Sequence, residues 1–435
     1  MATTESDITE AENLRERYRI EREKRLRPDG HTQYLEPTGR FAHLLEDPYS
    51  NHDPRETYTG EVTVAIIGGG FAGLSAGARL KEAGINDVML IESGGDVGGV
   101  WYWNRYPGAM CDTAAMVYLP LLEETNYFPS KKYVLGYEIH AHAQRIATTF
   151  GLYENALFST KVEDLSWNED LSRWIIRTNQ GDEIKAQFVA MGTGPMHHPK
   201  LPGIDGIEDF KGHMFHTARW DYDYTGGDRT GKPLEGLTDK RVGIIGTGAT
   251  AVQCIPHLAA SAGDFYVFQR TPSSIDIRNN RALTDEDFAD LDTDWQREWL
   301  INFATLQAGG FADADLVKDG RTDIAIRIRD RIVERIQADP GAGIEDVWME
   351  AFAESDDEKM NEIRARVDSV INDQTTAEAL KPWYRQLCKR PCFHDEYLQS
   401  FNNPNTHLVD TNGQGITQID ETGVWANGEH YELDC

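Results

Sequence analysis

Two stretches of the chain share one pattern of hydrophobic and polar positions. Residues 62–68 (VTVAIIG) form a short, β-branched apolar run that is followed at once by glycines and an Ala/Leu-rich helical pattern. The same succession begins at Arg241 (RVGIIGTGATAVQCIPHLA), about 180 residues later. Runs this short are typical of buried strands, and the glycines mark tight turns. The pattern therefore predicts two strand–turn–helix units, and their long spacing excludes a solenoid of short repeats.

The segment before the first unit has a different character. Residues 14–26 (LRERYRIEREKRL) carry mixed charge and predict an exposed helix. Four prolines, the last of them Pro54, break the stretch that follows into irregular structure. Residues 1–60 are therefore interpreted as an N-terminal extension.

The segments between and after the two units predict further elements. Strands are expected at 174–178 and 188–191, and helices across 283–380, where residues 324–336 repeat with helical period. Short strands and turns return from residue 406 to the end. The order of strands and helices indicates an α/β protein with a helical segment inside it.

Charge narrows the range of partners. The chain holds 72 Asp and Glu against 43 Lys and Arg, a formal net charge of −29. Such a balance argues against binding nucleic acid or an anionic membrane surface through bulk electrostatics. Within residues 281–380 the acidic residues number 25 and the basic ones 11, so this segment is expected to be a solvated surface.

Cysteine usage and apolar run lengths indicate the compartment. The five cysteines are odd in number and scattered, so neither a disulfide framework nor a zinc site is expected; the doublet His197–His198 likewise has no third metal ligand nearby. The N-terminus lacks an apolar leader, and no stretch of about 18 apolar residues occurs. A cytoplasmic protein without a membrane span or a metal is therefore expected. The cysteines are Cys111, Cys254, Cys388, Cys392 and Cys435.

The first glycine turn predicts a dinucleotide site. Residues 68–73 (GGGFAG) match GxGxxG directly after a strand, and Glu92 closes the next strand 19 residues past Gly73. Glycine is needed because a side chain would keep a pyrophosphate away from the helix N-terminus, and Glu92 can accept both ribose hydroxyls. An unphosphorylated ribose, as in FAD, fits this site. Its candidate residues here are Gly68, Gly70, Ala72, Gly73 and Glu92.

The second turn predicts a different coenzyme. Residues 246–251 (GTGATA) match GxGxxA, and the strand that follows ends in Arg270 and Thr271 rather than in an acid. A guanidinium pairs with a 2′-phosphate that a carboxylate would repel, so the second site should prefer NADPH. Two such nucleotides in one chain imply a flavoprotein. The candidate residues are Thr247, Gly248, Ala249, Thr250, Ala251, Gln253, Arg270 and Thr271.

Two longer motifs carry a family resemblance. Residues 210–221 (FKGHMFHTARWD) match FxGxxxHxxxW(P/D), with Phe210, Gly212, His216, Trp220 and Asp221 at the fixed positions. Residues 98–112 (GGVWYWNRYPGAMCD) match GGxWxxxx(F/Y)PGxxxD. Over about residues 60–435 the chain resembles the type I Baeyer–Villiger monooxygenases, which carry both patterns.

The resemblance implies an NADP domain inserted into an FAD domain, both Rossmann-like. The expected division is an extension at 1–60, the first part of the FAD domain at 61–190, an NADP domain at 191–390 that contains the helical insertion 283–380, and the start of the returning FAD part at 391–435. The sequence stops at Cys435, where family members continue through a further flavin- and substrate-facing segment. A C-terminal truncation with weak flavin retention is therefore expected.

The resemblance also implies the chemistry and its residues. FAD, NADPH and O2 would insert one oxygen atom next to a ketone carbonyl through a C4a-peroxyflavin and give an ester or lactone. Arg390 would be the catalytic cation, because its guanidinium keeps its charge, and Asp112 would position it. The matching positions for the flavin are Gly99, Val100, Trp101, Asp112, Tyr118 and Val162, and those for NADP include Lys389 and Arg390.

Other interpretations stay open at this point. An N- or S-oxygenating flavin monooxygenase shares both nucleotide turns, although His216 with Trp220-Asp221 favours the ketone-oxidising group. The early stop at Cys435 also leaves room for an inactive nucleotide-binding fragment. A disulfide reductase is disfavoured because Cys111 has no partner cysteine close by in the sequence.

Overall fold

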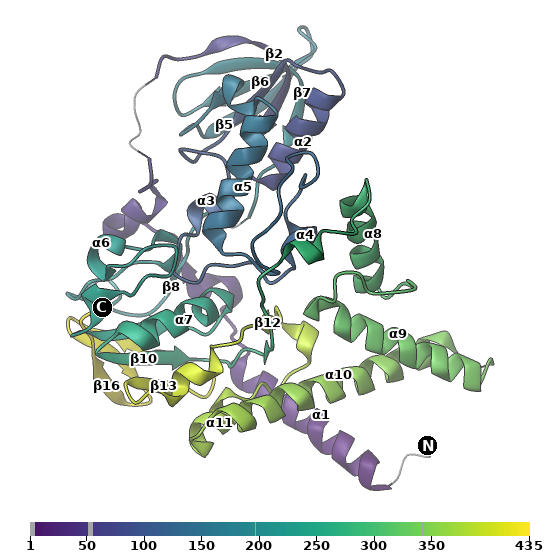
Figure 1. Ribbon diagram of the computed structural model, residues 1–435. Coiled ribbons are helices and arrows are strands. Elements are labelled where there is room, and N and C mark those ends of the chain that lie inside the picture. Colours follow the sequence, from purple (N-terminus) through teal and green to yellow (C-terminus); the bar gives the residue numbers. More distant parts are fainter. Residues whose placement is uncertain (1–4, 51–54, 196, 342) are drawn as a thin grey trace.

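The computed structural model describes residues 5–50, 55–195, 197–341 and 343–435 (Figure 1). Its helices are α1 (Glu5–Arg25), α2 (Phe71–Glu82), α3 (Val100–Trp103), α4 (Ala115–Tyr118), α5 (Gly136–Thr149), α6 (Tyr222–Thr225), α7 (Ala249–Ser261), α8 (Trp295–Gln307), α9 (Gly320–Ala338), α10 (Ile344–Val370) and α11 (Gln374–Leu380). Its strands are β1 (Tyr34–Leu35), β2 (Thr59–Ile67), β3 (Val88–Ile91), β4 (Ala156–Leu157), β5 (Val162–Asn168), β6 (Arg173–Thr178), β7 (Glu183–Met191), β8 (Leu201–Pro202), β9 (Arg241–Ile245), β10 (Asp264–Gln269), β11 (Ile275–Asp276), β12 (Cys392–Phe393), β13 (Thr406–Asp410), β14 (Gln418–Ile419), β15 (Gly423–Ala426) and β16 (Glu429–Glu432).

The first strand–turn–helix unit lies in a six-stranded sheet of order β4-β3-β2-β7-β6-β5. The strands β4, β3, β2 and β7 run parallel, and β6 and β5 add an antiparallel edge. Val64 and Ile66 of β2 pack with Leu74 of α2 and Ile146 of α5, so these helices cover one face. The period-two alternation of the strand places Ala65 in a cluster on the other face.

The second unit forms a smaller parallel sheet of order β13-β10-β9. Helix α7 connects β9 to β10 and buries Val252 and Ile255 against Val242 and Phe265. Two separate sheets, each with its own glycine turn, confirm the predicted α/β fold with two dinucleotide-binding units. In Figure 1 the first sheet lies above the second, and α8–α11 extend to one side.

The end of the chain differs from the expectation. Residues 391–435 were expected to begin the return to the FAD domain, but β13 pairs with β10 of the second sheet, from Phe265 opposite Thr406 to Gln269 opposite Asp410. The physical reason is apolar burial, because Val409 packs beside Phe268 in a shared cluster. The antiparallel strands β14–β16 follow and pack into the same cluster.

The N-terminal helix was expected to be exposed, and α1 does project from the body, but its inner end is anchored. The ring of Trp383 lies between two guanidinium groups, with Arg17 at 4.7 Å and Arg364 of α10 at 4.6 Å from its centroid. Figure 1 shows α1 running beneath α10. Cation–π contacts of this kind fix the helix on the helical segment.

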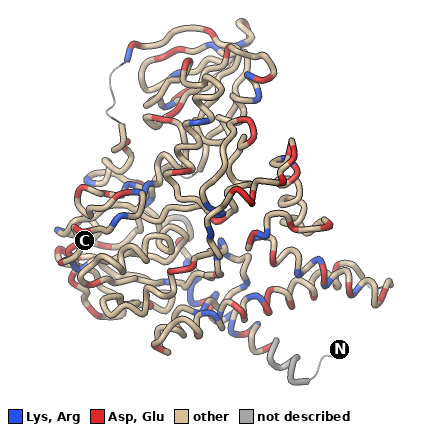
Figure 2. The backbone as a smooth tube through the Cα atoms, viewed as in Figure 1, with Lys and Arg blue, Asp and Glu red and all other residues tan. Residues whose placement is uncertain are grey.

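The expected helices across 283–380 are α8–α11, and they carry the acidic surface. Three arginines of α9 form ion pairs with glutamates of α10, such as Arg331 with Glu358 at 2.6 Å and Arg335 with Glu354 at 2.5 Å. Figure 2 shows both charge signs alternating along these two helices. Among the described residues, none of the helices combines the length and the apolar character needed to cross a bilayer.

Candidate functional site

The first glycine turn joins β2 to α2 through close backbone contacts. Gly68 has φ +110°, a conformation that L side chains rarely adopt, and a Cβ on it would lie 2.6 Å from the Gly192 carbonyl oxygen. A Cβ on Gly73 would lie 1.9 Å from the Gly68 carbonyl oxygen. Position 73 must therefore be a glycine, because any side chain would keep the helix away from the strand. The dinucleotide fingerprint requires this close approach.

Glu92 lies beside this turn, as its spacing predicts. Its buried carboxylate accepts the N–H groups of Gly69 at 2.5 Å and Gly94 at 2.7 Å. An ionised carboxylate has about four acceptor positions, so it can also accept hydroxyl groups of a ribose. Val162 is brought to the same end of the sheet, because Thr160, two residues earlier, donates its N–H to the Glu92 carbonyl at 2.9 Å.

The remaining flavin candidates gather around α3 and α4. A Cβ on Gly99, which has φ +54°, would lie 2.8 Å from the Gly70 Cα, so the start of α3 is pressed against the glycine turn. The Trp101 indole N–H donates to the Tyr118 hydroxyl at 2.8 Å, and burial raises the pKa of that hydroxyl. This cradle of glycine backbone bordered by aromatic rings fits a dinucleotide with a flat ring system.

The second glycine turn leaves open space at the start of α7. A Cβ on Gly246 or on Gly248 would meet no atom within 4 Å. The Thr247 hydroxyl donates to the Thr271 carbonyl at 2.8 Å, which ties the turn to the end of β10. Ala249, Thr250 and Ala251 form the first turn of α7, whose free N–H groups favour a phosphate. The turn therefore fits a second dinucleotide.

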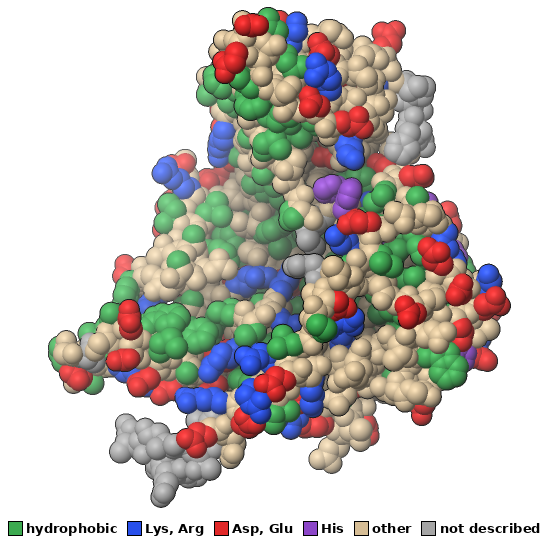
Figure 3. Space-filling model, turned by 180° about the vertical axis from the view of Figure 1, so that it is seen from behind, with side chains coloured by type: hydrophobic (Ala, Val, Ile, Leu, Met, Phe, Trp, Pro, Cys, Tyr) green, Lys and Arg blue, Asp and Glu red, His purple; other side chains and the backbone are tan. Residues whose placement is uncertain are grey.

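Basic residues lie where the second nucleotide would end. Arg270 follows β10, and Lys389 lies with its ammonium 5.4 Å from the ring centroid of Tyr384. Burial, and then the positive charges of Arg25 and Arg270, lower the pKa of Lys389 to about 8. Like charges brought together in this way form a site for an anion. Figure 3 shows Lys and Arg side chains gathered in a band across the lower half of the rear face.

The side chain of Gln253, an expected nucleotide-binding residue, contacts the loop that leads to Asp112. Its side chain is buried and donates to the Met110 carbonyl at 2.8 Å, while it accepts from the Met110 N–H at 3.2 Å and from the Tyr106 hydroxyl at 3.0 Å. A Cβ on Gly108, which has φ +77°, would lie 2.4 Å from the Gln253 carbonyl oxygen. Gln253 therefore ties α7 to the loop that leads to Asp112.

The structure brings Asp112 and Arg390 together and adds two arginines. The Asp112 carboxylate is 2% exposed, and the Arg390 Nη2 lies 3.2 Å from its Oδ2. Arg278, itself 4% exposed, pairs with Oδ1, and Arg321 lies 3.9 Å from Oδ2 and donates to the Asp112 carbonyl at 3.4 Å. A buried carboxylate needs such partners, because an uncompensated buried charge is strongly unfavourable.

Four chain segments supply this cluster. Asp112 ends the GGxW motif, Arg278 follows β11, Arg321 lies in the first turn of α9, and Arg390 precedes β12. Asp319, which caps α9, accepts the Ala114 N–H at 2.8 Å and so attaches the helical segment to the loop after Asp112. The sequence did not indicate Arg278, Arg321 or Asp319. These residues lie 166 to 209 positions after Asp112 in the chain, and no local motif links them to it.

The longer fingerprint, residues 210–221, connects the part of the chain that holds the first sheet with the part that holds the second. The Nδ1 of His216 accepts the Ala218 N–H at 3.1 Å, and burial lowers the pKa of His216 to about 4, so it is neutral near pH 7. The Trp220 indole donates to Thr225 at 3.1 Å, and Asp221 accepts the Tyr224 N–H at 3.0 Å.

Two further contacts join this segment to α3 on one side and to the second sheet on the other. The guanidinium of Arg219 lies 4.3 Å from the ring centroid of Trp103 in α3. A Cβ on Gly212 would lie 2.3 Å from Cζ of Phe210, which is buried in the cluster beneath the second sheet. The segment therefore contacts both parts through packing and hydrogen bonds.

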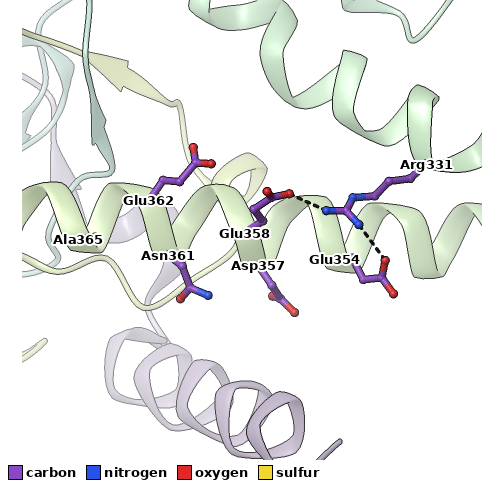
Figure 4. Close-up of a pocket in the computed structure, with 7 residues that line it drawn as sticks. All are labelled: Arg331, Glu354, Asp357, Glu358, Asn361, Glu362 and Ala365. Atoms are coloured by element: carbon purple, nitrogen blue, oxygen red, sulfur yellow. Dashed lines mark hydrogen bonds and ion pairs between the residues drawn. The ribbon is translucent and has the colours of Figure 1, made fainter. Parts of the chain in front are cut away.

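Two surface grooves lie on the described part of the chain, and the smaller one borders the segment that carries Arg278. The larger, about 770 Å³, runs along α10 beneath Arg331 and is lined mainly by carboxylates (Figure 4). The smaller, about 600 Å³, is lined by residues such as Asn279 and Asp395. Within the described ranges, no group of three or more His, Cys, Asp and Glu is placed to hold a metal ion.

Comparison with known proteins gives a family model and close relatives. Residues 65–281, which include both glycine turns, match the family described as pyridine nucleotide-disulphide oxidoreductase. The chain is 50% identical over 424 residues to the Baeyer-Villiger monooxygenase of Streptomyces coelicolor, covering 97% of this chain and 70% of that protein.

Solved structures agree with this result. The polycyclic ketone monooxygenase from the thermophilic fungus Thermothelomyces thermophila is similar with a TM-score of 0.89 at 36% identity, covering 98% of this chain and 71% of that one. OTEMO in complex with FAD and NADP is similar with a TM-score of 0.68 at 28% identity, covering 86% and 69%. Both nucleotides that the glycine turns predict are thus present in a structural neighbour.

Removing the Asp112 charge should destabilise the protein. In Asp112→Asn the buried Arg278 loses its carboxylate, and we expect the free energy of unfolding to fall by about 3–5 kcal/mol. Urea unfolding followed by tryptophan fluorescence measures this. Asp164→Asn, which removes an exposed partner of Arg177, is the control and should cost about 0–1 kcal/mol.

The double variant Asp112→Asn/Arg278→Gln separates the ion pair from other effects. The second change removes the unpaired buried charge. The double variant should therefore lose less free energy of unfolding than the two single variants lose together. Equal effects of Asp112→Asn and Asp164→Asn would show that the buried cluster does not hold these segments together.

Proposed function

The chain belongs to the Baeyer–Villiger monooxygenase family, and we propose that Arg390, positioned by Asp112, is the cation at its reacting centre. The protein is an FAD- and NADPH-dependent monooxygenase. Its reaction consumes a ketone, O2, NADPH and a proton and gives an ester or lactone, water and NADP⁺. The observation that carries the proposal for Arg390 is its contact with the buried Asp112 carboxylate.

The exposure of the two side chains supports these roles. Asp112 is 2% exposed and Arg390 is 55% exposed, so the carboxylate is fixed inside while the guanidinium reaches outward. Within the described part of the chain, Asp112 is the one ion-pair partner of Arg390, so most of its N–H groups are left to face a ligand. Asp112 acts as a positioning residue, because it orients Arg390 from inside.

Arg390 can stabilise negative charge that develops on oxygen. When bound, FAD supplies the transfer of electrons from NADPH to O2 and of one oxygen atom to the carbonyl. A guanidinium keeps its charge at any pH at which the protein is folded, and a fixed donor stabilises a developing anion without reorganisation. Arg278 and Arg321 also pair with the Asp112 carboxylate. The negative charge of Asp112 is therefore shared, and it does not neutralise the positive charge of Arg390.

We propose that the first sheet, within residues 61–190, binds FAD and that the second, within 191–390 together with β13, binds NADPH. Gly68, Gly70, Gly73 and Glu92 would hold the flavin nucleotide, with Trp101 and Tyr118 excluding water along the ring. Gly248 and the first turn of α7 would hold the pyrophosphate of NADPH, and Arg270, Thr271 and Lys389 its 2′-phosphate.

The substrate class proposed is a fused-ring ketone larger than cyclohexanone. The polycyclic ketone monooxygenase is similar over 98% of this chain, including the N-terminal extension, whereas OTEMO covers 86%. The similarity to a polycyclic ketone monooxygenase includes the N-terminal extension, and this supports a bulky ketone as the substrate. A panel of monocyclic and polycyclic ketones, with NADPH consumption and product identification, tests the class; lactone from small rings alone would contradict it.

Replacing Arg270 should change the choice of coenzyme. Arg270→Ala should weaken NADP⁺ binding by about tenfold to a hundredfold, because a charge-assisted pair contributes about 1.5–3 kcal/mol. NAD⁺ binding should change little, since NAD⁺ has no 2′-phosphate. Titration calorimetry with both coenzymes measures this, and Arg297→Ala, an exposed arginine of α8, is the control. Equal loss for both coenzymes would contradict the assignment.

The lowered pKa of Lys389 predicts a pH dependence of coenzyme choice. Below about pH 8 its ammonium is protonated and attracts the 2′-phosphate, and above it the charge is lost. A phosphate monoester stays dianionic over this range because its second pKa is about 6. The NADP⁺ to NAD⁺ affinity ratio should therefore fall roughly threefold to tenfold from pH 7 to 9. Lys389→Met should flatten the profile; an unchanged slope in that variant would exclude Lys389.

Replacing Arg390 should separate reduction from oxygen insertion. Arg390→Ala should keep flavin binding and NADPH-driven reduction, because hydride transfer needs no stabilised oxygen anion. Ester formation should fall roughly a hundredfold to a thousandfold, with O2 diverted to hydrogen peroxide. Stopped-flow reduction, peroxide release and product analysis with a polycyclic ketone measure this. Arg390→Lys should restore only part of the yield, since a point charge lacks the planar fork. A normal ester yield from Arg390→Ala would remove this residue from the mechanism.

A further inference from the structure

The inner end of the N-terminal extension lies beside the second nucleotide site. We propose that Arg25 and Gln33, both from this extension, complete the binding site for the 2′-phosphate of NADPH. The inference rests on the proposed assignment of Arg270 and Lys389 to that phosphate. It makes the extension a determinant of coenzyme selectivity in addition to any role toward the ketone.

One loop lies beside both Arg25 and Arg270. A Cβ on Gly413 would lie 3.3 Å from Cγ of Arg25, and a Cβ on Gly415 would lie 3.7 Å from Cδ of Arg270. The two glycines are two positions apart in the loop that follows β13. The stems of both arginines therefore border this short loop, one from α1 and one from the end of β10.

Gln33 contacts Arg270 directly. Its side-chain oxygen accepts from Nη1 of Arg270 at 2.7 Å. A neutral acceptor orients the guanidinium without neutralising it, whereas a carboxylate at this position would compete with a phosphate. Gln33 lies just before β1, which pairs with β8, so its backbone is held in place.

Arg25 keeps its charge available although it has a carboxylate partner. Its Nη1 lies 2.5 Å from the buried Glu21 carboxylate, which also faces Lys24 at 2.9 Å and Arg17 at 3.3 Å. One anion is thus shared by three cations. Within the described residues, the buried Nε of Arg25 has no hydrogen-bond partner.

The charges around this position sum to a surplus of cations. Arg25 pairs with Glu21, and Arg270 lies near Asp29, which Arg27 binds; Lys389 adds a further cation. Arg25 and Arg270 act on Lys389 strongly enough to contribute to its lowered pKa. A 2′-phosphate carries a charge of about −1.5 to −2 at pH 7 and offers three acceptor oxygens. It would neutralise this surplus.

Binding of three probes to the full chain tests the proposal. NADP⁺, NAD⁺ and adenosine 2′,5′-bisphosphate are titrated by calorimetry into wild type and Arg25→Ala. We expect about tenfold weaker binding of the two 2′-phosphorylated probes and less than twofold change for NAD⁺. Glu21 keeps Lys24 and Arg17 in this variant, so no buried carboxylate is left unpaired. Arg22→Ala, an exposed arginine in the last turn of the same helix, is the matched control and should bind as wild type.

Gln33→Glu provides an independent arm. The new carboxylate would pair with Arg270 and repel the phosphate, so the NADP⁺ to NAD⁺ affinity ratio should fall about tenfold or more. Arg25→Ala should also move the pH at which NADP⁺ binding weakens to a higher value, because Lys389 loses a neighbouring charge; a merely structural role of Arg25 would not shift this profile.

The outcomes separate this proposal from the function it rests on. If Arg270→Ala loses NADP⁺ selectivity while Arg25→Ala and Gln33→Glu keep it, the phosphate site stands and the role of the extension is overturned. If Arg25→Ala weakens NAD⁺ and NADP⁺ equally, the extension acts on folding alone and the proposal is likewise overturned. If Arg270→Ala keeps its selectivity, the assignment of the phosphate site itself is wrong.

Discussion

The buried charge of Asp112 is the constraint on which the arrangement of the site depends. A carboxylate that is 2% exposed is tolerable only when cations and hydrogen bonds compensate it, and here three guanidinium groups do so. Each guanidinium comes from a different segment, after β11, in α9 and before β12. Because the carboxylate needs these partners, the segments that carry them are drawn to one point. The contacts that compensate the buried charge of Asp112 therefore also place Arg390.

The loop before Asp112 carries this constraint to the second sheet. Gln253 of α7 bonds to both sides of the loop, at Tyr106 and Met110, and Gly108 lets the loop lie against the helix backbone. The same loop continues through Asp112 to Ala114, which the cap of α9 holds. A single stretch of about nine residues thus fixes the second nucleotide turn, the helical segment and Arg390 relative to the first part. Transfer between two bound nucleotides requires such fixed relative positions.

What could be predicted from the sequence was what depends on neighbouring residues. Both glycine turns and the position of Glu92 follow from strand, turn and helix patterns, and β13 begins at residue 406, where short strands and turns were expected. Residues 391–435 were expected in the returning FAD part, but β13 pairs with β10, because a short apolar strand fits the edge of either sheet and only the burial of Val409 beside Phe268 decides. Gln253 has a motif position typical of nucleotide binding, but its side chain turns to another loop. Arg278 and Arg321 depend wholly on tertiary contacts.

Charge separation lets a strongly acidic chain bind an anionic coenzyme. A net charge of −29 would repel NADPH if it were spread evenly. A large part of the acidic excess lies instead in residues 281–380, where 25 acidic residues stand against 11 basic ones, and where arginines of α9 pair with glutamates of α10 at the surface. Interactions between exposed charges decay within about 8–10 Å at physiological salt, so this surface acts weakly on a distant site. Arg270, which is half-buried, is screened less. The local potential at the coenzyme site is therefore set by the few cations at the end of β10 and α1, and the extension contributes to it.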